Sequence, residues 1–454
     1  MEEIAGKTAA VPLDSGKSLL ARVLRFRDLV VLVIGTVIGS GIFLVPGAIL
    51  RQVGNSVPLA TAVWLIGGLL SLLGALTCGE LSAMKPQAGG VYVYIRDCFG
   101  PFVAFLFGWT LFFVISSGSI ATLAVAFCDY SAELVPLNPL MGRLVSVVMI
   151  TVIALVNVLG TRRSADLQDV TTAVKVAAIV LMSSALLGLG KGSSSVPVAP
   201  HDLSAGGYAS GFGLAMISVL WAYEGWQYAT FSAGEAIDPQ RNFPLAFFAG
   251  SAALIAIYLL ANFGYLAALG PAGVSASDRV AAAAVSRVIG PAAAKLVALT
   301  ILVSIFSATN GIVLTASRVY YAMAQDGLFF KRLAEVHPRF KTPAFAVVAC
   351  CVWSAVLAVT GTFEQLLTYV VFIGWIFYAL AAGTVFVYRK REPEADRPYR
   401  VPGYPFTPAL FIAAAAYLVI NTVVTQPRRA AAGIAIVLLG APAYAIWRHK
   451  ERTS

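Results

Sequence analysis

Charged residues are scarce in this sequence. Only 12% of its 454 residues are Asp, Glu, Lys or Arg, whereas 59% are hydrophobic, and the mean hydropathy is +0.82. A soluble domain carries about 25% charged residues, so an ordinary soluble protein is excluded. The length fits about a dozen helices of about 20 apolar residues, the length that a membrane span needs. The composition therefore predicts an all-α membrane protein with many spans.

Residues that build catalytic or metal sites are also few. There are five cysteines and three histidines. The cysteines lie in or near apolar segments, without the spacing of metal ligands, so buried inert thiols are expected. The histidines form no cluster, and no phosphate-binding loop or hydrolase triad is present. The sequence therefore predicts no enzyme, no cofactor and no metal site.

Positive charge, in contrast, is in excess, with a net charge of +10. Most Lys and Arg residues fall in alternate loops, which is the positive-inside pattern of membrane proteins and argues against a nucleic-acid binder. Arg428 and Arg429 are exceptions. The pattern places both tails, 1–27 and 448–454, in the cytoplasm. The polar N-terminal tail runs directly into the first apolar segment, so no cleavable signal peptide is expected.

Apolar segments separated by short polar loops predict twelve transmembrane helices, with boundaries good to a few residues. The predicted helices cover residues 28–50, 57–83, 98–131, 143–160, 167–190, 209–235, 242–270, 281–323, 342–361, 363–388, 404–425 and 430–447. Two of them, the first and the sixth, contain residues that disfavour a continuous helix.

The first predicted helix contains a glycine-rich stretch in its middle, Gly39-Ser40-Gly41, and glycine weakens a helix. Broken backbone at membrane depth persists only where protein buries it or where it lines a cavity. A break here would leave backbone amides unpaired between Ile38 and Ile42, at the positive end of a helix dipole. Such amides suit a carboxylate. The alternative is glycine used for close helix packing.

The sixth predicted helix is interrupted in a similar way. Trp221, Ala222, Glu224 and Gly225 put a carboxylate and a glycine in the middle of an apolar segment. Unpaired carbonyl groups near Trp221 and Ala222 would suit an ammonium group. A cluster that binds a carboxylate beside a cluster that binds an ammonium describes a site for an α-amino acid.

The two interrupted helices lie five helices apart. Broken helices at corresponding positions of two halves are the sequence signature of an inverted-repeat transporter. The two halves would be residues 28–190 and 209–388, and the odd number of helices in each gives them opposite topology. The last two helices, residues 404–447, then lie outside the repeat.

Lys175 is a charged residue within the apolar fifth helix. A charge at the bilayer centre costs roughly 2.5–3.5 kcal/mol on insertion scales and requires an internal partner. The alternative is a lysine near the end of the helix that snorkels to the interface. Because burial penalises a charged amine, Lys175 is also a candidate proton carrier.

The motifs together resemble those of the amino acid–polyamine–organocation (APC) superfamily. The IGSGIF sequence at 38–43 is similar to its signature, as are residues 234–244 and 397–403. Within the superfamily the chain resembles the L-type amino acid transporter (LAT) family, whose aromatic-Ala-Tyr-x-Gly-Trp pattern matches residues 221–226. The resemblance implies a LeuT-like fold with a 5+5 inverted repeat, and sodium-independent exchange of amino acids.

The resemblance also implies roles for single residues. Lys175 would stand where sodium-coupled relatives hold a sodium ion, bridging the first helix to the eighth, whose Asn310 belongs to a family pattern. Trp221 would be an aromatic lid over the substrate, unless it is an ordinary core or lipid-facing residue. Glu224 resembles the acidic residue of the cystine and dibasic amino acid exchangers, which predicts neutral and cationic substrates. The alternative is a carboxyl that is paired internally or protonated.

The predicted sites are thus of two kinds. The predicted substrate-binding residues are Ile38, Gly39, Ser40, Gly41, Ile42, Trp221, Ala222, Glu224 and Gly225. The predicted coupling or gating residues are Lys175, Trp221 and Asn310.

An external cysteine of the eukaryotic LAT proteins, which binds a single-span glycoprotein, is missing here. The corresponding loop, residues 133–139, has no cysteine. The chain therefore resembles a bacterial member of the inner membrane without a disulfide-linked partner. Its expected partners are neutral and cationic L-amino acids and the lipid bilayer. Proton-coupled amino acid symport, polyamine transport and amino acid sensing are the competing functions.

Overall fold

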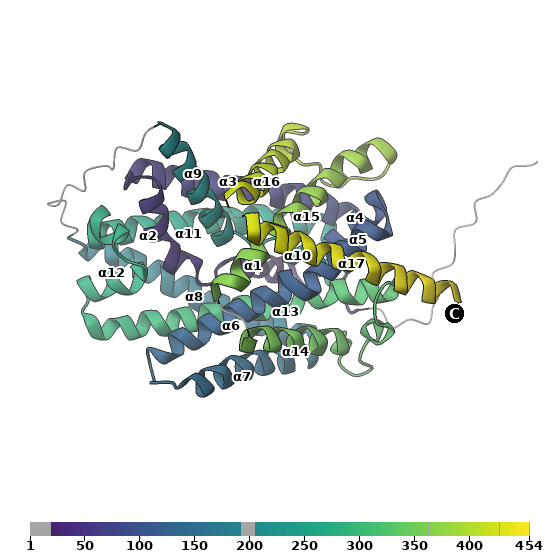
Figure 1. Cartoon of the computed structure of the whole chain (residues 1–454), viewed down its shortest axis with the longest axis horizontal. Helices are drawn as coiled ribbons and strands as arrows, with labels where there is room; N and C mark the ends of the chain where they lie inside the picture. The colour runs from purple at the N-terminus through teal and green to yellow at the C-terminus, as the bar shows by residue number, and fades with distance from the viewer. Residues whose placement is uncertain (1–19, 192–204, 361–362, 426, 454) are drawn as a thin grey trace, which may run out of the picture.

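The computed structural model of the chain describes residues 20–191, 205–360, 363–425 and 427–453 (Figure 1). Within these residues the regular structure is helical, apart from one isolated bridge between Leu24 and Ala236. Parts of the predicted N-terminal tail and of the segment between the predicted halves lie outside the described residues.

The helices follow the chain in two groups, before and after residue 200. The first group contains α1 (Phe26–Val37), α2 (Gly41–Gln52), α3 (Val57–Met84), α4 (Val91–Phe99), α5 (Pro101–Thr110), the π-helix η1 (Leu111–Ile115), α6 (Ser116–Ala132), α7 (Pro139–Val158) and α8 (Thr161–Leu189). The second group contains α9 (Ala205–Ala222), α10 (Tyr228–Phe231), η2 (Ala233–Glu235), α11 (Pro239–Ser275), α12 (Val280–Val288), η3 (Pro291–Ala293), α13 (Ala294–Gln325), η4 (Lys331–Ala334), α14 (Ala344–Thr360), α15 (Phe363–Arg391), α16 (Phe406–Thr425) and α17 (Pro427–Thr453).

Many of these helices are long and apolar enough to cross a membrane. Among the described residues eight helices meet this condition, and the bent pair of α1 and α2 makes a ninth. Two shorter apolar helices cover Ser210–Ala222 and Ala344–Thr360. A spanning helix satisfies its own backbone hydrogen bonds, which lipid cannot do. The chain is therefore an all-helical membrane protein with several spans.

The interruptions predicted in the first and sixth helices are confirmed. Helix α1 ends at Val37 and α2 starts at Gly41, and their axes are bent by 49°. Helix α9 ends at Ala222, and a turn separates it from α10. Gly39 lies in the first break and Gly225 in the second, so the low helix propensity of glycine was sufficient to predict both breaks.

Some predicted boundaries were wrong. The predicted helix 281–323 is two helices, α12 and α13, because Gly290 adopts a φ of 121° and Pro291 follows it. The predicted helix 98–131 starts at Pro101, because Gly100, with a φ of 89°, separates α4 from α5. Helix α8 begins six residues before the predicted 167. Its polar first turns are supported by an Arg162–Asp166 ion pair at spacing i,i+4.

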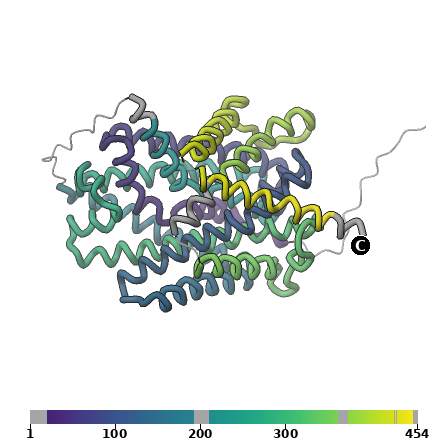
Figure 2. The backbone as a smooth tube through the Cα atoms, in the orientation of Figure 1, coloured from purple at the N-terminus to yellow at the C-terminus, as the bar shows by residue number. Residues whose placement is uncertain are grey.

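The broken first helix lies in the interior of the bundle. Helix α1 contacts α8, α10, α11 and α13, and its label lies near the centre of Figure 1. The C-terminal helices α16 and α17, yellow in Figure 2, lie on the surface of the bundle against α3, α5 and α15. The helices of residues 26–391 thus surround the break, and the last two helices add to the outside.

A buried ion pair joins the end of α13 to the segment after α10. Arg318 Nε lies 2.5 Å from Glu235 Oε2, Arg318 Nη2 lies 3.0 Å from Oε1, and both side chains are fully buried. The hydroxyl of Thr161, at the start of α8, donates a hydrogen bond of 2.7 Å to Oε1. The Glu235 carbonyl also accepts the amides of Val23 and Leu24. Glu235 therefore connects Val23 and Leu24 with α8 and α13.

We expect Arg318→Met to destabilise the protein strongly. Removing one partner of a buried ion pair costs about 3–5 kcal/mol, because the other charge remains buried without compensation. The measurement is the thermal unfolding midpoint in detergent. Lys85→Met is the control, since its pair with Glu392 is partly exposed and contributes little. Equal midpoints for the two variants would show that the buried pair is not a stabilising contact.

Candidate functional site

The break in the first helix leaves a short non-helical segment between α1 and α2. Ile38 has an extended conformation, with φ −74° and ψ 92°, and Ser40 is the N-cap of α2. The first four amides of a helix have no partner within it, so the start of α2 presents amide donors. Gly41 lies against the second break: a Cβ atom there would lie 3.2 Å from Cα of Ala222.

Lys175 of α8 contacts the other side of this break. Its Nζ lies 2.7 Å from the carbonyl oxygen of Gly35, 2.6 Å from that of Ile38 and 3.4 Å from that of Ser304. The side chain is fully buried, so it does not snorkel to the interface. An ammonium group has three donors and no acceptor, and here three carbonyl oxygens receive them. Lys175 thus joins α1, α8 and α13.

Asn310 lies in a polar network beside Lys175 and does not line the cavity described below. Its Oδ1 accepts hydrogen bonds from Asn157 and Ser164, at 3.0 and 3.1 Å. Its Nδ2 donates to the Gln168 side chain at 2.9 Å, and Gln168 in turn donates to Ser307. All these residues are buried. Asn310 therefore connects α7, α8 and α13 and reaches the first break only through other side chains.

The second break, between α9 and α10, contacts the first one directly. Gly225 has a φ of 133°, and a Cβ atom there would lie 2.7 Å from the carbonyl oxygen of Thr36. The hydroxyl of Thr36 donates to the Gly225 carbonyl at 3.0 Å. Only glycine fits this position, because both its conformation and its close approach exclude a side chain.

The carbonyl groups expected to be free at this break accept hydrogen bonds within the protein. The Trp221 carbonyl accepts the amide of Glu224 at 3.1 Å, and the Ala222 carbonyl accepts the hydroxyl of Tyr258 at 2.9 Å. A carbonyl oxygen has two lone pairs, so the Ala222 carbonyl can accept a second hydrogen bond. The prediction of unpaired carbonyls was therefore too simple, since Tyr258 of α11 carried no signal in the sequence.

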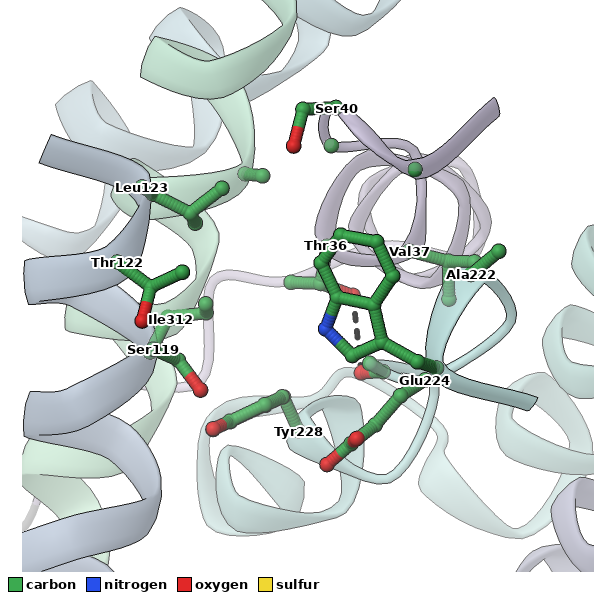
Figure 3. A pocket seen from close by; sticks show the side chains of 15 residues that line it. Thr36, Val37, Ser40, Ser119, Thr122, Leu123, Ala222, Glu224, Tyr228 and Ile312 are labelled. Atoms are coloured by element: carbon green, nitrogen blue, oxygen red, sulfur yellow. Dashed lines mark hydrogen bonds between the residues drawn. The ribbon is translucent and has the colours of Figure 1, made fainter. Parts of the chain in front are cut away.

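A cavity of about 70 Å³ lies between the two breaks (Figure 3). Of the predicted substrate-binding residues, Gly39, Ser40, Gly41, Trp221, Ala222, Glu224 and Gly225 line it. Ile38 and Ile42 do not; their side chains are fully buried elsewhere. The lining residues that sequence reasoning missed are Thr36, Val37, Ser119, Thr122, Leu123, Tyr228, Ala308 and Ile312. Apart from Tyr228 of α10, they are small or apolar residues on α1, α6 and α13, and only the tertiary fold brings them together.

Three polar atoms around this cavity are buried without a hydrogen-bond partner among the described residues. They are Oγ of Ser40, Oγ1 of Thr122 and Oε2 of Glu224. Figure 3 shows Ser40 and Glu224 at opposite ends of the group of labelled side chains, with Thr122 on α6. Buried polar groups are normally paired, so these atoms indicate a ligand that supplies polar partners.

Comparison with known proteins agrees with this geometry. A family model described as amino acid permease matches residues 24–441. The serine/threonine exchanger SteT of Bacillus subtilis is 32% identical over 416 residues, covering 91% of this chain and 94% of that protein. The human large neutral amino acids transporter small subunit 2 is 30% identical, covering 93% of this chain and 80% of that protein. The human cystine/glutamate transporter is 31% identical, covering 93% of this chain and 85% of that protein.

The family resemblance read from the sequence motifs is therefore confirmed over almost the whole chain. The protein is an amino acid transporter of the membrane and is not an enzyme. The chain belongs to the amino acid permease family of the APC superfamily, among its members of the L-type amino acid transporter kind.

Proposed function

We propose that the protein exchanges L-amino acids across the membrane, without sodium, by alternating access. The main support is the contact of Lys175 with the first break. Its ammonium group already supplies the positive charge beside the carbonyl oxygens of Gly35 and Ile38. A fixed internal cation removes the need for an external one. The names of two relatives, a serine/threonine exchanger and a cystine/glutamate transporter, agree with amino acid transport.

The same contact favours exchange over proton symport with Lys175 as the carrier. Three carbonyl oxygens surround Nζ, and a carbonyl accepts hydrogen bonds but cannot donate one. The neutral amine would turn its lone pair toward oxygen lone pairs, whereas the ammonium group satisfies every contact. The three contacts therefore favour the charged form of Lys175, which suits a fixed cation better than a proton carrier.

The proposed architecture is LeuT-like, with twelve spans and both termini in the cytoplasm. The first inverted repeat is residues 28–190 and the second is 209–388, with 404–447 outside the repeat and 1–27 and 448–454 as tails. In support, α1/α2 opens the first repeat and α9/α10 opens the second, and the two breaks meet at one cavity.

The proposed substrate lies between the breaks. Its carboxylate binds the amides at the start of α2, and its ammonium group binds the carbonyls near Trp221 and Ala222. Trp221, which lines the cavity, acts as the lid. Glu224 adds cationic substrates to neutral ones. The loop 133–139 has no cysteine, so the transporter works without a disulfide-linked partner.

We expect uptake into proteoliposomes to require amino acid inside them. Labelled amino acid enters vesicles preloaded with unlabelled amino acid, at the same rate with and without sodium, because exchange returns the carrier only when it is loaded. The screen includes the twenty amino acids and putrescine. Uptake into empty vesicles driven by a pH gradient would instead show a symporter. Putrescine as the best substrate would show a polyamine transporter, and binding without flux would show a sensor.

Lys175→Met is expected to lower exchange at least about tenfold, since it removes hydrogen bonds from a charged donor that contribute about 1.5–3 kcal/mol each. The measurement is the initial rate of exchange, normalised to folded protein. Lys295→Met, which changes an exposed lysine at the start of α13, is the matched control. Exchange at the wild-type rate in Lys175→Met would contradict the role of a fixed cation.

Glu224→Gln is expected to reduce lysine or arginine exchange roughly tenfold and leucine exchange by less than about twofold, because a charged hydrogen bond is lost only with a cationic side chain. Competition of each amino acid against a common labelled substrate gives the ratio. Glu394→Gln, at an exposed position, is the control. Equal loss for cationic and neutral substrates would rule out a role of Glu224 in selectivity.

A further inference from the structure

A chain of hydrogen bonds connects the second break to the carboxylate of Glu224. The Gly225 amide donates to Gln227 Oε1 at 3.1 Å, and Gln227 Nε2 donates to the Tyr378 hydroxyl at 2.7 Å. The Tyr378 hydroxyl then donates to Glu224 Oε1 at 3.0 Å. Tyr378 belongs to α15 and lies 154 residues from Glu224 in the sequence, so only the fold brings the two together.

The first member of this chain determines the direction of all its bonds. A backbone amide can only donate, so the Gln227 oxygen accepts from Gly225, and the Gln227 amino group faces Tyr378. The Tyr378 oxygen accepts this bond, which leaves its own hydrogen for Glu224. Oε1 of Glu224 is therefore a fixed acceptor. Oε2 is buried and has no hydrogen-bond partner among the residues that the structure describes.

The Tyr378 ring is held in place by its neighbours. It contacts the rings of Trp226 and Trp375, with centroids 6.4 and 6.1 Å apart. A Cβ atom on Gly374, one turn earlier in α15, would lie 3.1 Å from the Tyr378 hydroxyl oxygen. The space that glycine leaves at this position is thus taken by Tyr378, and the hydroxyl group cannot move away without repacking.

We propose that Tyr378 is a specificity-determining residue: its hydroxyl takes one acceptor position of Glu224 Oε1, so that Oε2 is the carboxylate oxygen most open to a substrate side chain. This inference rests on the proposed function. A guanidinium group binds a carboxylate best through two parallel hydrogen bonds, one to each oxygen. An ammonium or hydroxyl group needs a single acceptor.

The substrate class follows from this arrangement. A carboxylate with one open oxygen, and a second oxygen that already accepts a hydrogen bond, favours amino acids whose side chains end in a single donor group. The site is therefore suited to ornithine, lysine, serine and threonine, and it discriminates against arginine, whose planar fork meets an oxygen that is already engaged.

The test is Tyr378→Phe, which removes the hydroxyl group and keeps the ring. In exchange assays with proteoliposomes, lysine, ornithine, serine, arginine and leucine compete against one labelled substrate. The apparent affinity for arginine relative to lysine should rise on the order of tenfold, because the hydrogen bond that competes with the fork at Oε1 is removed. Leucine should change little. An unchanged arginine-to-lysine ratio, or an equal change for all five amino acids, would overturn the proposal.

A double variant separates positioning from a general structural effect. Glu224→Gln removes the charge that the fork would bind, so adding Tyr378→Phe to it should not shift the arginine-to-lysine ratio. Groups that act through one another show such non-additivity. If the ratio shifts equally in both backgrounds, Tyr378 does not act through Glu224.

Two further variants complete the experiment. Tyr388→Phe is the matched control: it removes a bond of 3.1 Å from the same helix to the Asp97 carboxylate, away from the cavity, and should leave the ratio unchanged. Tyr378→Met serves if Tyr378→Phe does not fold. It also removes the hydrogen bond to Oε1 and should shift the ratio in the same direction; no shift would overturn the proposal. A wild-type protein that exchanges no amino acid would contradict the proposed function itself. Exchange with an arginine-to-lysine ratio that Tyr378→Phe does not change would contradict only this inference.

Discussion

The architecture depends on one interaction, the binding of the Lys175 ammonium group to the carbonyl oxygens that the first helix leaves open where it breaks. Those carbonyls lie at the C-terminal end of α1, where the helix dipole is negative and a cation is favourable. The Ser304 hydroxyl of α13 lies 3.0 and 2.8 Å from the carbonyl oxygens of Ile38 and Gly39, which share its one hydrogen. An interrupted helix in the interior of a membrane protein would otherwise leave these groups unsatisfied. The break can therefore persist because α8 and α13 supply its missing partners.

This interaction is the last of a series of polar contacts along one side of α8. Thr161, Ser164, Gln168, Thr172 and Lys175 recur at spacings of three and four residues, so they share one face of the helix. All five are buried, and they meet Ser304, Ser307 and Asn310 of α13. The first of them, Thr161, binds the buried Glu235–Arg318 pair, and the last binds the break. A continuous polar interface thus runs from the ion pair to the cavity.

Local sequence patterns were sufficient for the breaks, the burial of Lys175 and the family. Glycine weakens an apolar helix, and a lysine within one carries a charge that lipid cannot solvate. Both features can be recognised from the sequence alone. No such signal marks Gln168, Tyr258 or Tyr378, because single polar or aromatic residues are common in buried helices. Their roles depend on partners up to 221 residues away, which no local pattern specifies. A Gly-Pro pair marks the boundary at Gly290, but the apolar residues on both sides of it predict one continuous helix.

The close contact between the two breaks limits how this kind of protein can diversify. Gly41 approaches the backbone of Ala222, and Gly225 approaches the backbone of Thr36, so neither position can acquire a side chain without separating the breaks. Changes in the shape of the cavity must therefore arise in the surrounding wall, at lining positions such as Thr122 on α6. For protein engineering, backbone packing fixes the contact between the breaks, and the wall of the cavity is the part that can be redesigned.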